Sequence, residues 1–416
     1  MSGLDLRLTL SSLLLGLTAC GAELPRDSSQ RAPVTLGVDV LLDQRIELVE
    51  GLRVGLVTHP AGVDGELVPT IDRLARDERV NLVQLFGPEH GVRGDVAAGE
   101  DVEDARDALT GIPVESLYGA RRRPSEESLA ELDVLLFELQ DVGARMYTYI
   151  STLGEVMRAA GEAGVKVIVL DRPNPLGGLH PEGPMVGAAW KSFISWGPLP
   201  MTHGMTLGEI AHYWRDEVGV ACDLEVVWMR GWQREMVWED TGLHWIQSSP
   251  HIPHSVNAHL YLATGAIGES FEGLHCGVGY TTPFEVLASS ALDEHALTEA
   301  MRARDLKGVR FLPFVGRPFY GAQQGEELRG VRLVLTDPRE FQPVRTAMAL
   351  LLELHAALDE DLRVKSERAF AIRWGNLELL KLVRGGASLS ELERSLELGL
   401  SEFRIARARH LHYGSK

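Results

Sequence analysis

Asn81-Leu-Val-Gln-Leu-Phe86 is a short apolar run, and the turn Gly87-Pro-Glu-His-Gly91 follows it at once with a carboxylate and an imidazole. The same arrangement recurs further along, where Val165-Lys-Val-Ile-Val-Leu170 is followed by Asp171-Arg-Pro-Asn-Pro175. Apolar runs of this length between turn residues are typical of buried strands in a parallel sheet. The two stretches therefore predict an α/β fold in which polar loops follow the strands.

Helical segments separate these strands along the chain, which is the signature of a parallel sheet with helices on its faces. Two further strands are expected at 53–58 and 132–139, and the apolar spacing of helices is found at 70–77 and 152–163. The series continues with a helix at 206–217, which Thr206 and Glu209 can open as a capping box, and a strand at 224–228. We therefore predict a Rossmann-like catalytic domain over residues 36–245.

The rest of the chain, residues 246–416, has a different pattern. A folded part of roughly 380 residues is long for one core, so a second domain is expected. It begins with a loop-rich stretch near 245–285 and then shows strands at 309–314 and 330–335 and helices at 343–358 and 388–401. These elements predict a smaller α+β domain at 246–416 that contributes to the site.

The N-terminus has the features of an export signal. The apolar run at 8–17 is too short to span a bilayer. It ends in Leu17-Thr-Ala-Cys20, which resembles the lipobox of bacterial lipoproteins, whose cysteine is lipidated. We expect a lipoprotein signal peptide at 1–20, a flexible tether at 21–35, and an exported lipoprotein on the periplasmic side of a membrane in the cell envelope. The alternative is an ordinary signal peptide in which Cys20 falls by chance.

The composition excludes several classes of partner and chemistry. A net charge of −18 argues against nucleic acid and against an anionic membrane surface, which leaves the lipid anchor as the only expected membrane contact. The turn after the first strand reads Thr58-His-Pro-Ala-Gly62 instead of a glycine-rich dinucleotide loop, and neither a phosphate loop nor a serine nucleophile elbow is present. No cofactor is expected. Cys222 and Cys276 can form a disulfide in an oxidising compartment, but their spacing does not decide it.

Polar clusters follow the strands at 81–86, 132–139 and 165–170. In open α/β sheets, ligands bind beyond the carboxyl ends of the strands. Turn formation explains the glycines and prolines of these loops. It does not explain the charged residues, which are Glu89, His90, Arg93, Asp141 and Arg145.

Glycoside hydrolysis requires a carboxylic acid that protonates the leaving oxygen, usually with a second group opposite it. Glu89 is the leading candidate for this acid/base, with His90 beside it and Asp141 as a second catalytic candidate. Other carboxylates that can face Glu89 are Asp171, Glu272 and Glu285. The alternative is that Glu89 only caps the turn that follows it.

Several residues have the chemistry needed to bind a sugar. Arg145 can bind a carboxylate and Tyr147 can stack on a sugar face, although Tyr147 and Tyr149 are equally consistent with a helix start whose rings lie in the core. His203 precedes a helix N-terminus, which can hold an anion. The predicted substrate-binding residues are Arg93, Arg145, Tyr147, Asp171, Arg172, Asn174, His203 and Glu272.

Histidine and tryptophan clusters in the middle of the chain each have a simpler explanation than a functional site. The histidines at 251, 254 and 259 match no zinc signature, so no metal is expected. The tryptophans at 228, 232, 238 and 245 can line a carbohydrate cleft, but scattered tryptophans are more often packing residues.

Four motifs together resemble the NamZ-type exo-β-N-acetylmuramidases, a family long described only as a domain of unknown function. They are Phe86-Gly-Pro-Glu-His-Gly-Val-Arg-Gly94, Gln140-Asp-Val-Gly-Ala-Arg-Met-Tyr-Thr-Tyr149, Asp171-Arg-Pro-Asn-Pro175 and His203-Gly-Met-Thr206. The resemblance covers residues 36–352. It implies a Rossmann-like domain with a smaller C-terminal domain, and a glycosidase that releases N-acetylmuramic acid from the non-reducing end of peptidoglycan fragments without a nucleotide cofactor. The implied partners are peptidoglycan-derived sugars or muropeptides, with Arg145 or the helix end at His203 as receptor for the lactyl carboxylate.

The sequence also departs from the family pattern. Members tend to have asparagine in a Ser-Pro-Asn-x-Pro segment, where this chain has His251, and they carry Glu-Gly-Thr-Asn followed by Gly-Arg-Gly-Thr. Here Glu272-Gly-Leu-His-Cys-Gly-Val-Gly-Tyr-Thr-Thr282 has Leu274, His275 and Tyr280. These changes leave two alternatives open, a lipid-anchored glycan-binding protein without catalysis and a glycosidase for a different acidic sugar.

Overall fold

The computed structural model describes residues 32–94 and 105–414. The expected signal peptide, Cys20 and most of the expected tether lie outside the described residues. The strands are β1 (Arg53–Val57), β2 (Asn81–Gly87), β3 (Ala105–Arg106), β4 (Pro113–Ser116), β5 (Val134–Phe137), β6 (Lys166–Leu170), β7 (Leu224–Val227), β8 (Val286–Ser289), β9 (Val309–Gly316) and β10 (Leu328–Leu335).

The helices are α1 (Gly37–Gln44), α2 (Thr70–Arg76), α3 (Glu126–Ala130), α4 (Tyr149–Ala163), α5 (Leu207–Asp216), α6 (Ser255–Leu260), α7 (Ala266–Gly268), α8 (Glu294–Arg302), α9 (Pro343–Leu358), α10 (Glu367–Trp374), α11 (Glu378–Arg384) and α12 (Leu389–Ala408). Shorter helical turns are η1 (Ile46–Leu48), η2 (Ala188–Trp190), η3 (Trp238–Asp240), η4 (Tyr261–Gly265) and η5 (Asp359–Asp361). No helix among residues 32–94 and 105–414 is long and apolar enough to cross a membrane.

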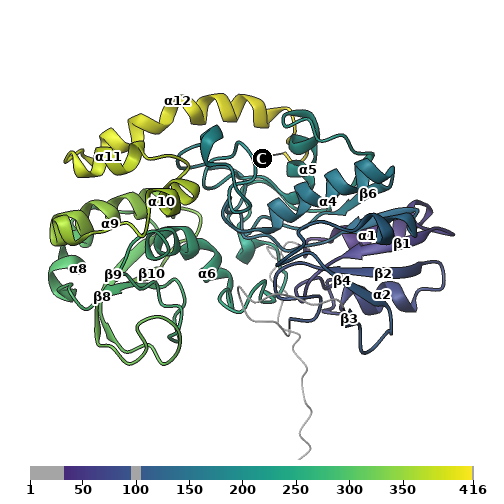
Figure 1. The fold of residues 1–416 in the computed structure, drawn as a ribbon, viewed down its shortest axis with the longest axis horizontal. Coiled ribbons are helices and arrows are strands. Elements are labelled where there is room, and N and C mark those ends of the chain that lie inside the picture. The colour runs from purple at the N-terminus through teal and green to yellow at the C-terminus, as the bar shows by residue number, and fades with distance from the viewer. Residues whose placement is uncertain (1–31, 95–104, 415–416) are drawn as a thin grey trace, which may run out of the picture. The chain divides into compact units, whose positions relative to one another are not determined.

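The first sheet has the strand order β3-β4-β2-β1-β5-β6-β7 (Figure 1). All of its neighbouring strands run parallel except β3, which pairs antiparallel with β4. The strands predicted at 53–58, 81–86, 132–139, 165–170 and 224–228 are β1, β2, β5, β6 and β7. The prediction of a Rossmann-like parallel sheet is therefore confirmed, although the sequence reading missed the short strand β4.

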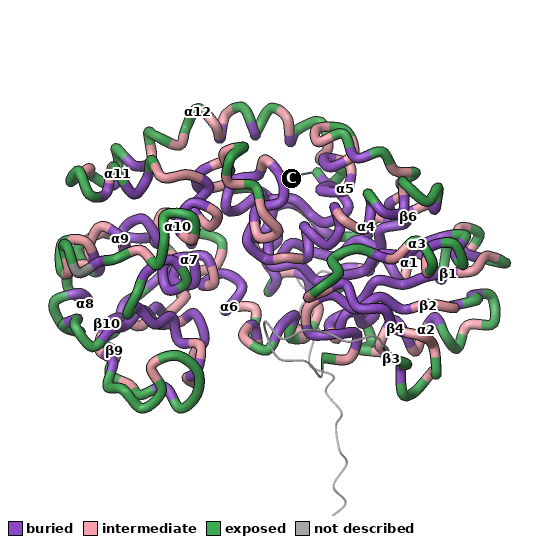
Figure 2. The backbone as a smooth tube through the Cα atoms, in the orientation of Figure 1, coloured by how far each residue is buried: buried purple, intermediate pink, exposed green. Residues whose placement is uncertain are grey.

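Alternate residues of these strands enter two cores. Leu56, Leu85 and Leu136 pack with α1 and α2, whereas Phe86 and Phe137 face α4 and α5. Burying each such side chain contributes about 1.5–3 kcal/mol. Because both faces are covered, β5 is apolar throughout and β6 is apolar after Lys166, and Figure 2 shows that the sheet interior is buried.

The second sheet is antiparallel, with the order β8-β10-β9. Its helices α8 and α9 pack on it, and the core that covers one face of the first sheet continues into α9 and α10. The predicted helices at 343–358 and 388–401 are α9 and α12. The stretch expected to be loop-rich contains α6, η4 and α7 instead, because Asn257 caps α6 and apolar residues after it are fully buried.

The C-terminal segment returns to the first sheet. Figure 1 shows α12 running from α11 toward α5, near the end of the chain. Tyr213 of α5 contacts Phe403 and His410 with ring centroids 5.8 and 5.6 Å apart. Residues from Pro33 onward form one compact unit. The α+β character of the second part is confirmed, and the boundary at 245/246 stays a prediction.

Candidate active site

Strand register brings several predicted residues to one edge of the first sheet. Val57, at the end of β1, pairs with Phe86 of β2 and with Phe137 of β5. The residues that follow these positions therefore leave the sheet at the same edge, which is where parallel sheets bind ligands. His59, Glu89 and Asp141 belong to these loops.

Glu89 lies in a tight turn directly after β2. The backbone N–H of Gly91 donates to the Pro88 carbonyl at 3.0 Å, and His90 has a φ of 76°. A residue with a side chain rarely adopts this left-handed conformation, and such strain gathers at functional sites. Glu89 itself is half-buried, and its Oε2 accepts a hydrogen bond from Thr148 Oγ1 at 3.3 Å. The turn thus presents a partly exposed carboxylate of fixed orientation.

The second part of the chain places His251 and Tyr261 near Glu89. Burial lowers the pKa of His251, as does the charge of His90, whereas Glu89 and Glu269 act in the opposite direction. Burial raises the pKa of Tyr261, and its phenol is close enough to Glu89 to feel that charge. The Tyr261 ring also meets Tyr147 edge-on, with centroids 6.1 Å apart. The acid candidate is therefore surrounded by aromatic and imidazole groups.

Tyr147 and Tyr149 form a buried tyrosine layer, in which the Tyr147 ring contacts Tyr261. Their hydroxyls donate to Ser248 Oγ at 3.0 Å and to the Ser248 carbonyl at 2.8 Å. Their rings are buried and meet edge-on at 4.7 Å, and the His59 ring contacts Tyr149 at 4.9 Å. Tyr149 is the first residue of α4. The burial of both rings agrees with the alternative that they belong to the core at a helix start, and both hydroxyls bind Ser248.

Asp141 and His203 face one another in the buried layer. Asp141 Oδ2 accepts the Gly143 N–H at 2.7 Å and lies 3.4 Å from His203 Nε2. His203 Nδ1 accepts the Met205 N–H at 3.2 Å, so the proton of the neutral ring is on Nε2, toward Asp141. The charge of Asp141 contributes to the raised pKa of Tyr147. This buried pair is therefore linked to the tyrosines by its charge.

Arg145 has a different environment from the one expected of a substrate-binding residue. Its side chain is fully buried, and its guanidinium donates to the carbonyls of Pro184 and Leu199 at 2.7 Å each and of Arg373 at 2.6 Å. Burial lowers the pKa of Arg145 to about 9, which still leaves it charged at neutral pH. Arg145 therefore links distant segments of the chain by binding their backbone carbonyls.

The loop after β6 is also closed. Asp171 accepts the Gly208 N–H at 2.9 Å and the Tyr413 hydroxyl at 2.6 Å, and burial raises its pKa to about 7. Arg172 donates to Glu138 Oε1 at 2.7 Å inside the protein. Asn174 holds the Met205 carbonyl at 3.0 Å. The structure does not bring these three predicted residues into an open position beside Glu89.

Arg93 is engaged in ion pairs, and Glu272 lies on the surface. Arg93 pairs with Asp107 and Asp72 at 2.7 Å each. Glu272 is exposed, and its backbone N–H donates to the Arg363 carbonyl at 2.8 Å. These two predicted substrate-binding residues have structural or surface environments here.

The segment that departs from the family pattern is largely buried. Leu274 and His275 are buried, and His275 Nδ1 accepts the Gly277 N–H at 3.0 Å. The half-buried Tyr280 packs edge-on against Phe314 at 5.6 Å. Cys276 and Cys222 are both free thiols. Glu285 pairs with Arg332 at 2.8 Å.

Sequence reasoning missed His59, Ser248, His251 and Tyr261 as members of this group. His59 had a usable signal, because it follows β1 just as Glu89 follows β2. His251 stood out in the sequence only as a departure from a family motif, and no local pattern connects Ser248 or Tyr261 to the loops after β1, β2 and β5. The remaining histidines of that stretch lie elsewhere: His254 precedes α6, and His259 is buried within it.

The tryptophans act as packing residues. Trp232 and Trp238 are buried, Trp228 stacks on His412 at 4.0 Å, and Trp245 meets Trp238 edge-on at 4.8 Å. The alternative in which they line a carbohydrate cleft finds no support in these contacts.

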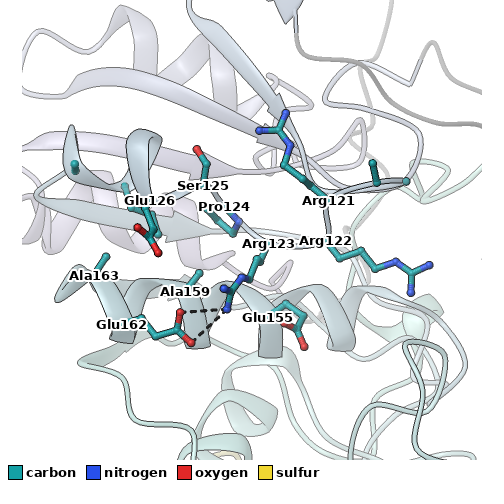
Figure 3. Close-up of a pocket in the computed structure, with 14 residues that line it drawn as sticks. Arg121, Arg122, Arg123, Pro124, Ser125, Glu126, Glu155, Ala159, Glu162 and Ala163 are labelled. Atoms are coloured by element: carbon teal, nitrogen blue, oxygen red, sulfur yellow. Dashed lines mark hydrogen bonds and ion pairs between the residues drawn. The ribbon is translucent and has the colours of Figure 1, made fainter.

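A separate cavity of about 890 Å³ lies between α3, α4 and the loop that carries Arg121, Arg122 and Arg123 (Figure 3). Arg123 pairs with Glu162 at 3.1 Å, and the Arg122 guanidinium lies 4.4 Å from the centre of the Phe193 ring. None of the predicted catalytic or substrate-binding residues lines this cavity.

Comparisons with known proteins agree on one family. The model for the N-terminal domain of exo-beta-N-acetylmuramidase NamZ matches residues 54–256, and the model for its C-terminal domain matches residues 259–413. The peptidoglycan beta-N-acetylmuramidase NamZ of Bacillus subtilis is 37% identical over 418 residues, which covers 98% of this chain and 100% of that protein.

Two crystal structures of DUF1343 family proteins from Bacteroides fragilis have the same fold. One is 38% identical with a TM-score of 0.86, and the alignment covers 92% of this chain and 100% of the other. The second has the same coverage, with 24% identity and a TM-score of 0.73, and shows likeness of fold alone.

Proposed function

This chain belongs to the NamZ family of exo-β-N-acetylmuramidases, and from this premise we propose that it is a glycosidase that removes terminal N-acetylmuramic acid from the non-reducing end of peptidoglycan fragments. The family resemblance carried by its four motifs is confirmed by the domain models and by the full-length relative. The observation within the structure that supports the proposal best is the setting of Glu89.

The surroundings of Glu89 support its proposed role as the acid/base. It is held by Thr148 at the end of β2, and it lies among His251, Tyr261 and the buried tyrosine layer. A carboxylic acid in this position protonates the oxygen of the leaving sugar as the glycosidic bond breaks. Over the whole cycle, water supplies the hydroxyl that ends on the anomeric carbon and the proton that restores the acid form of Glu89. His90 belongs to the same turn, and the charge of Asp141 acts on Tyr147.

The test uses a chromogenic β-glycoside of N-acetylmuramic acid. Wild-type protein should release the chromophore, and Glu89→Gln should reduce kcat about 1000-fold, since general acid–base catalysis contributes about 10²–10⁴-fold. Glu127→Gln, an exposed carboxylate of α3, is the matched control and should keep full activity. Unchanged release by Glu89→Gln would remove Glu89 from the mechanism.

The departures at Leu274, His275 and Tyr280 favour a second candidate, a glycosidase for a different acidic sugar. Product analysis of mixed cell-wall digests distinguishes the two, because N-acetylmuramic acid should be the released sugar under the main proposal. Binding of muropeptides without any turnover would instead indicate a glycan-binding protein that lacks catalysis.

We also propose that Cys20 carries a lipid anchor that holds the protein on the periplasmic side of a membrane in the cell envelope. The support is the sequence Leu17-Thr-Ala-Cys20 after an apolar run. In a bacterial host, labelled palmitate should be incorporated into the wild type and not into Cys20→Ser. Equal labelling of both proteins would contradict the anchor.

A further inference from the structure

An anionic sugar requires a cation close to the acid, and this protein has a net charge of −18. The arginines that the sequence suggested for this role are committed to other partners. Arg145 is buried against carbonyl groups, Arg172 pairs with Glu138, and Arg93 pairs with Asp107. None of these three arginines is therefore available to bind the carboxylate of the substrate.

Arg373 of α10 is a partly exposed basic group. Its side chain is 20% exposed, its Nη1 donates to the Ala369 carbonyl at 3.0 Å, and its Nη2 lies 3.4 Å from Glu269 Oε2. Glu269 is itself 55% exposed, so this is a long and solvated ion pair of small energetic value. A guanidinium has five N–H donors, and these two contacts leave donors that can bind a carboxylate.

The first part of the chain fixes the position of Arg373. The Arg145 guanidinium donates to the Arg373 carbonyl at 2.6 Å, and the Ser195 hydroxyl donates to the Ile372 carbonyl. The Gly187 N–H donates to the Gly375 carbonyl at 2.8 Å. The last carbonyls of a helix have no partners within it, so these bonds satisfy the end of α10 and hold it against the sheet domain.

The same loop connects Arg373 to the acid candidate. Arg145, which holds the Arg373 backbone, is separated by two residues from Thr148, which donates to Glu89 at 3.3 Å. Between them, Tyr147 contacts the Tyr261 ring at 6.1 Å, and the Tyr261 phenol lies in the field of Arg373, Glu269 and Glu89 together. Arg373 and Glu89 therefore both act on the charge state of the same tyrosine, Tyr261.

We propose that Arg373 is the specificity-determining residue that binds the carboxylate of the acidic substituent on the terminal sugar. This inference rests on the proposed function and names the subsite that makes it selective for an acidic sugar. The substrate carboxylate replaces the long contact to Glu269 with a bidentate pair, and the sugar ring then lies between Arg373 and Glu89. Arg145 acts through Arg373 as its positioning residue.

The test compares two chromogenic β-glycosides that differ only in the lactyl group, one of N-acetylmuramic acid and one of N-acetylglucosamine. Arg373→Gln should raise KM for the acidic substrate about 10- to 100-fold, as expected for loss of a charge-assisted hydrogen bond, and should change kcat less than about threefold. Any hydrolysis of the neutral substrate should be unaffected. The KM of Arg373→Lys for the acidic substrate should lie between those of wild type and Arg373→Gln, because an ammonium lacks the planar, forked donors of a guanidinium.

Arg368→Gln is the matched control, an exposed arginine on the same helix that should behave as wild type. Thermal melting checks that each variant is folded. A KM for the acidic substrate that stays within about threefold in Arg373→Gln would overturn the inference, as would an equal rise in KM for both substrates.

Failure of the proposed function has a separate signature, namely no turnover by the wild type. Calorimetric titration with free N-acetylmuramic acid and with N-acetylglucosamine then tests the subsite alone. Tighter binding of the acidic sugar that is lost in Arg373→Gln supports the inference, and equal binding of both sugars by the wild type refutes it.

Discussion

The loops after β2 and β6 have the same pattern in the sequence and different roles in the structure. Each follows a buried strand at the same edge of the sheet, and each begins with proline and charged residues. Glu89 in the first loop stays half-buried beside His251, whereas Asp171 in the second is sealed by Tyr413 and by the N-terminus of α5. A polar residue that follows a strand can therefore contact substrate only where no segment from later in the chain covers it.

The largest expected effect comes from the same carboxyl-to-amide change in the two loops. Glu89→Gln should lower kcat about 1000-fold and leave the free energy of unfolding within about 0.5 kcal/mol of wild type. Asp171→Asn should leave kcat near wild type and lower the free energy of unfolding by about 1–2 kcal/mol at pH 6, because it disturbs the bonds from Tyr413 and Gly208. Kinetics and urea denaturation of both variants provide the measurement.

If Asp171→Asn remains fully stable and loses as much activity as Glu89→Gln, the two loops do not differ in role as described. The loop after β6 would then contribute to catalysis directly, and its closure by Tyr413 would have to open during turnover.

The next effect concerns Arg145, a sequence-predicted binding residue that the structure buries. Arg145→Met should lower the free energy of unfolding by about 3 kcal/mol or more, because the carbonyls of Pro184, Leu199 and Arg373 each lose a donor. It should also raise KM for the acidic glycoside, since Arg373 loses its support. Arg368→Met, on the exposed face of α10, should do neither.

Direct binding of substrate by Arg145 would give a different result. Affinity would fall while the unfolding midpoint in urea stayed unchanged, and Arg373→Gln would have little effect on KM.

The smallest effect is a dependence of stability on pH at the closed loop. The pKa of Asp171 is raised from 3.8 to about 7 by burial, so the folded protein holds a proton there that the unfolded chain releases above pH 3.8. Its contribution to stability is complete below that pH and is lost as the pH rises through about 7. The slope is at most about 1.4 kcal/mol per pH unit.

Asp171→Asn removes this proton, and other titrating groups are common to both proteins. The stability difference between wild type and Asp171→Asn, measured by urea denaturation from pH 5 to pH 8, should therefore shrink as the pH rises. A difference that grows with pH would mean that the folded protein prefers the charged carboxylate.

Much of the fold could be predicted from the sequence because the signals are local. Apolar runs with intervening amphipathic stretches gave the long strands of the first sheet and the helices α2, α4, α5, α9 and α12 within a few residues. The capping box of Thr206 and Glu209 is confirmed at the start of α5. The short strand β4 was missed, since four residues carry too little periodicity, and α6 was missed because prolines and histidines conceal its buried face.

The α/β class, the position of Glu89 after a strand and the family could be predicted from the sequence alone, because hydrophobic periodicity and contiguous motifs are properties of neighbouring residues. Which polar residues remain accessible to solvent depends on the tertiary structure. Tyr413 seals Asp171 across 242 positions, and Arg145 reaches Arg373 across 228. Burial and hydrogen-bond partners at such separations depend on how the whole chain packs. For this reason Arg145 is buried and binds backbone carbonyls, whereas Arg373 remains partly exposed and is proposed to bind substrate.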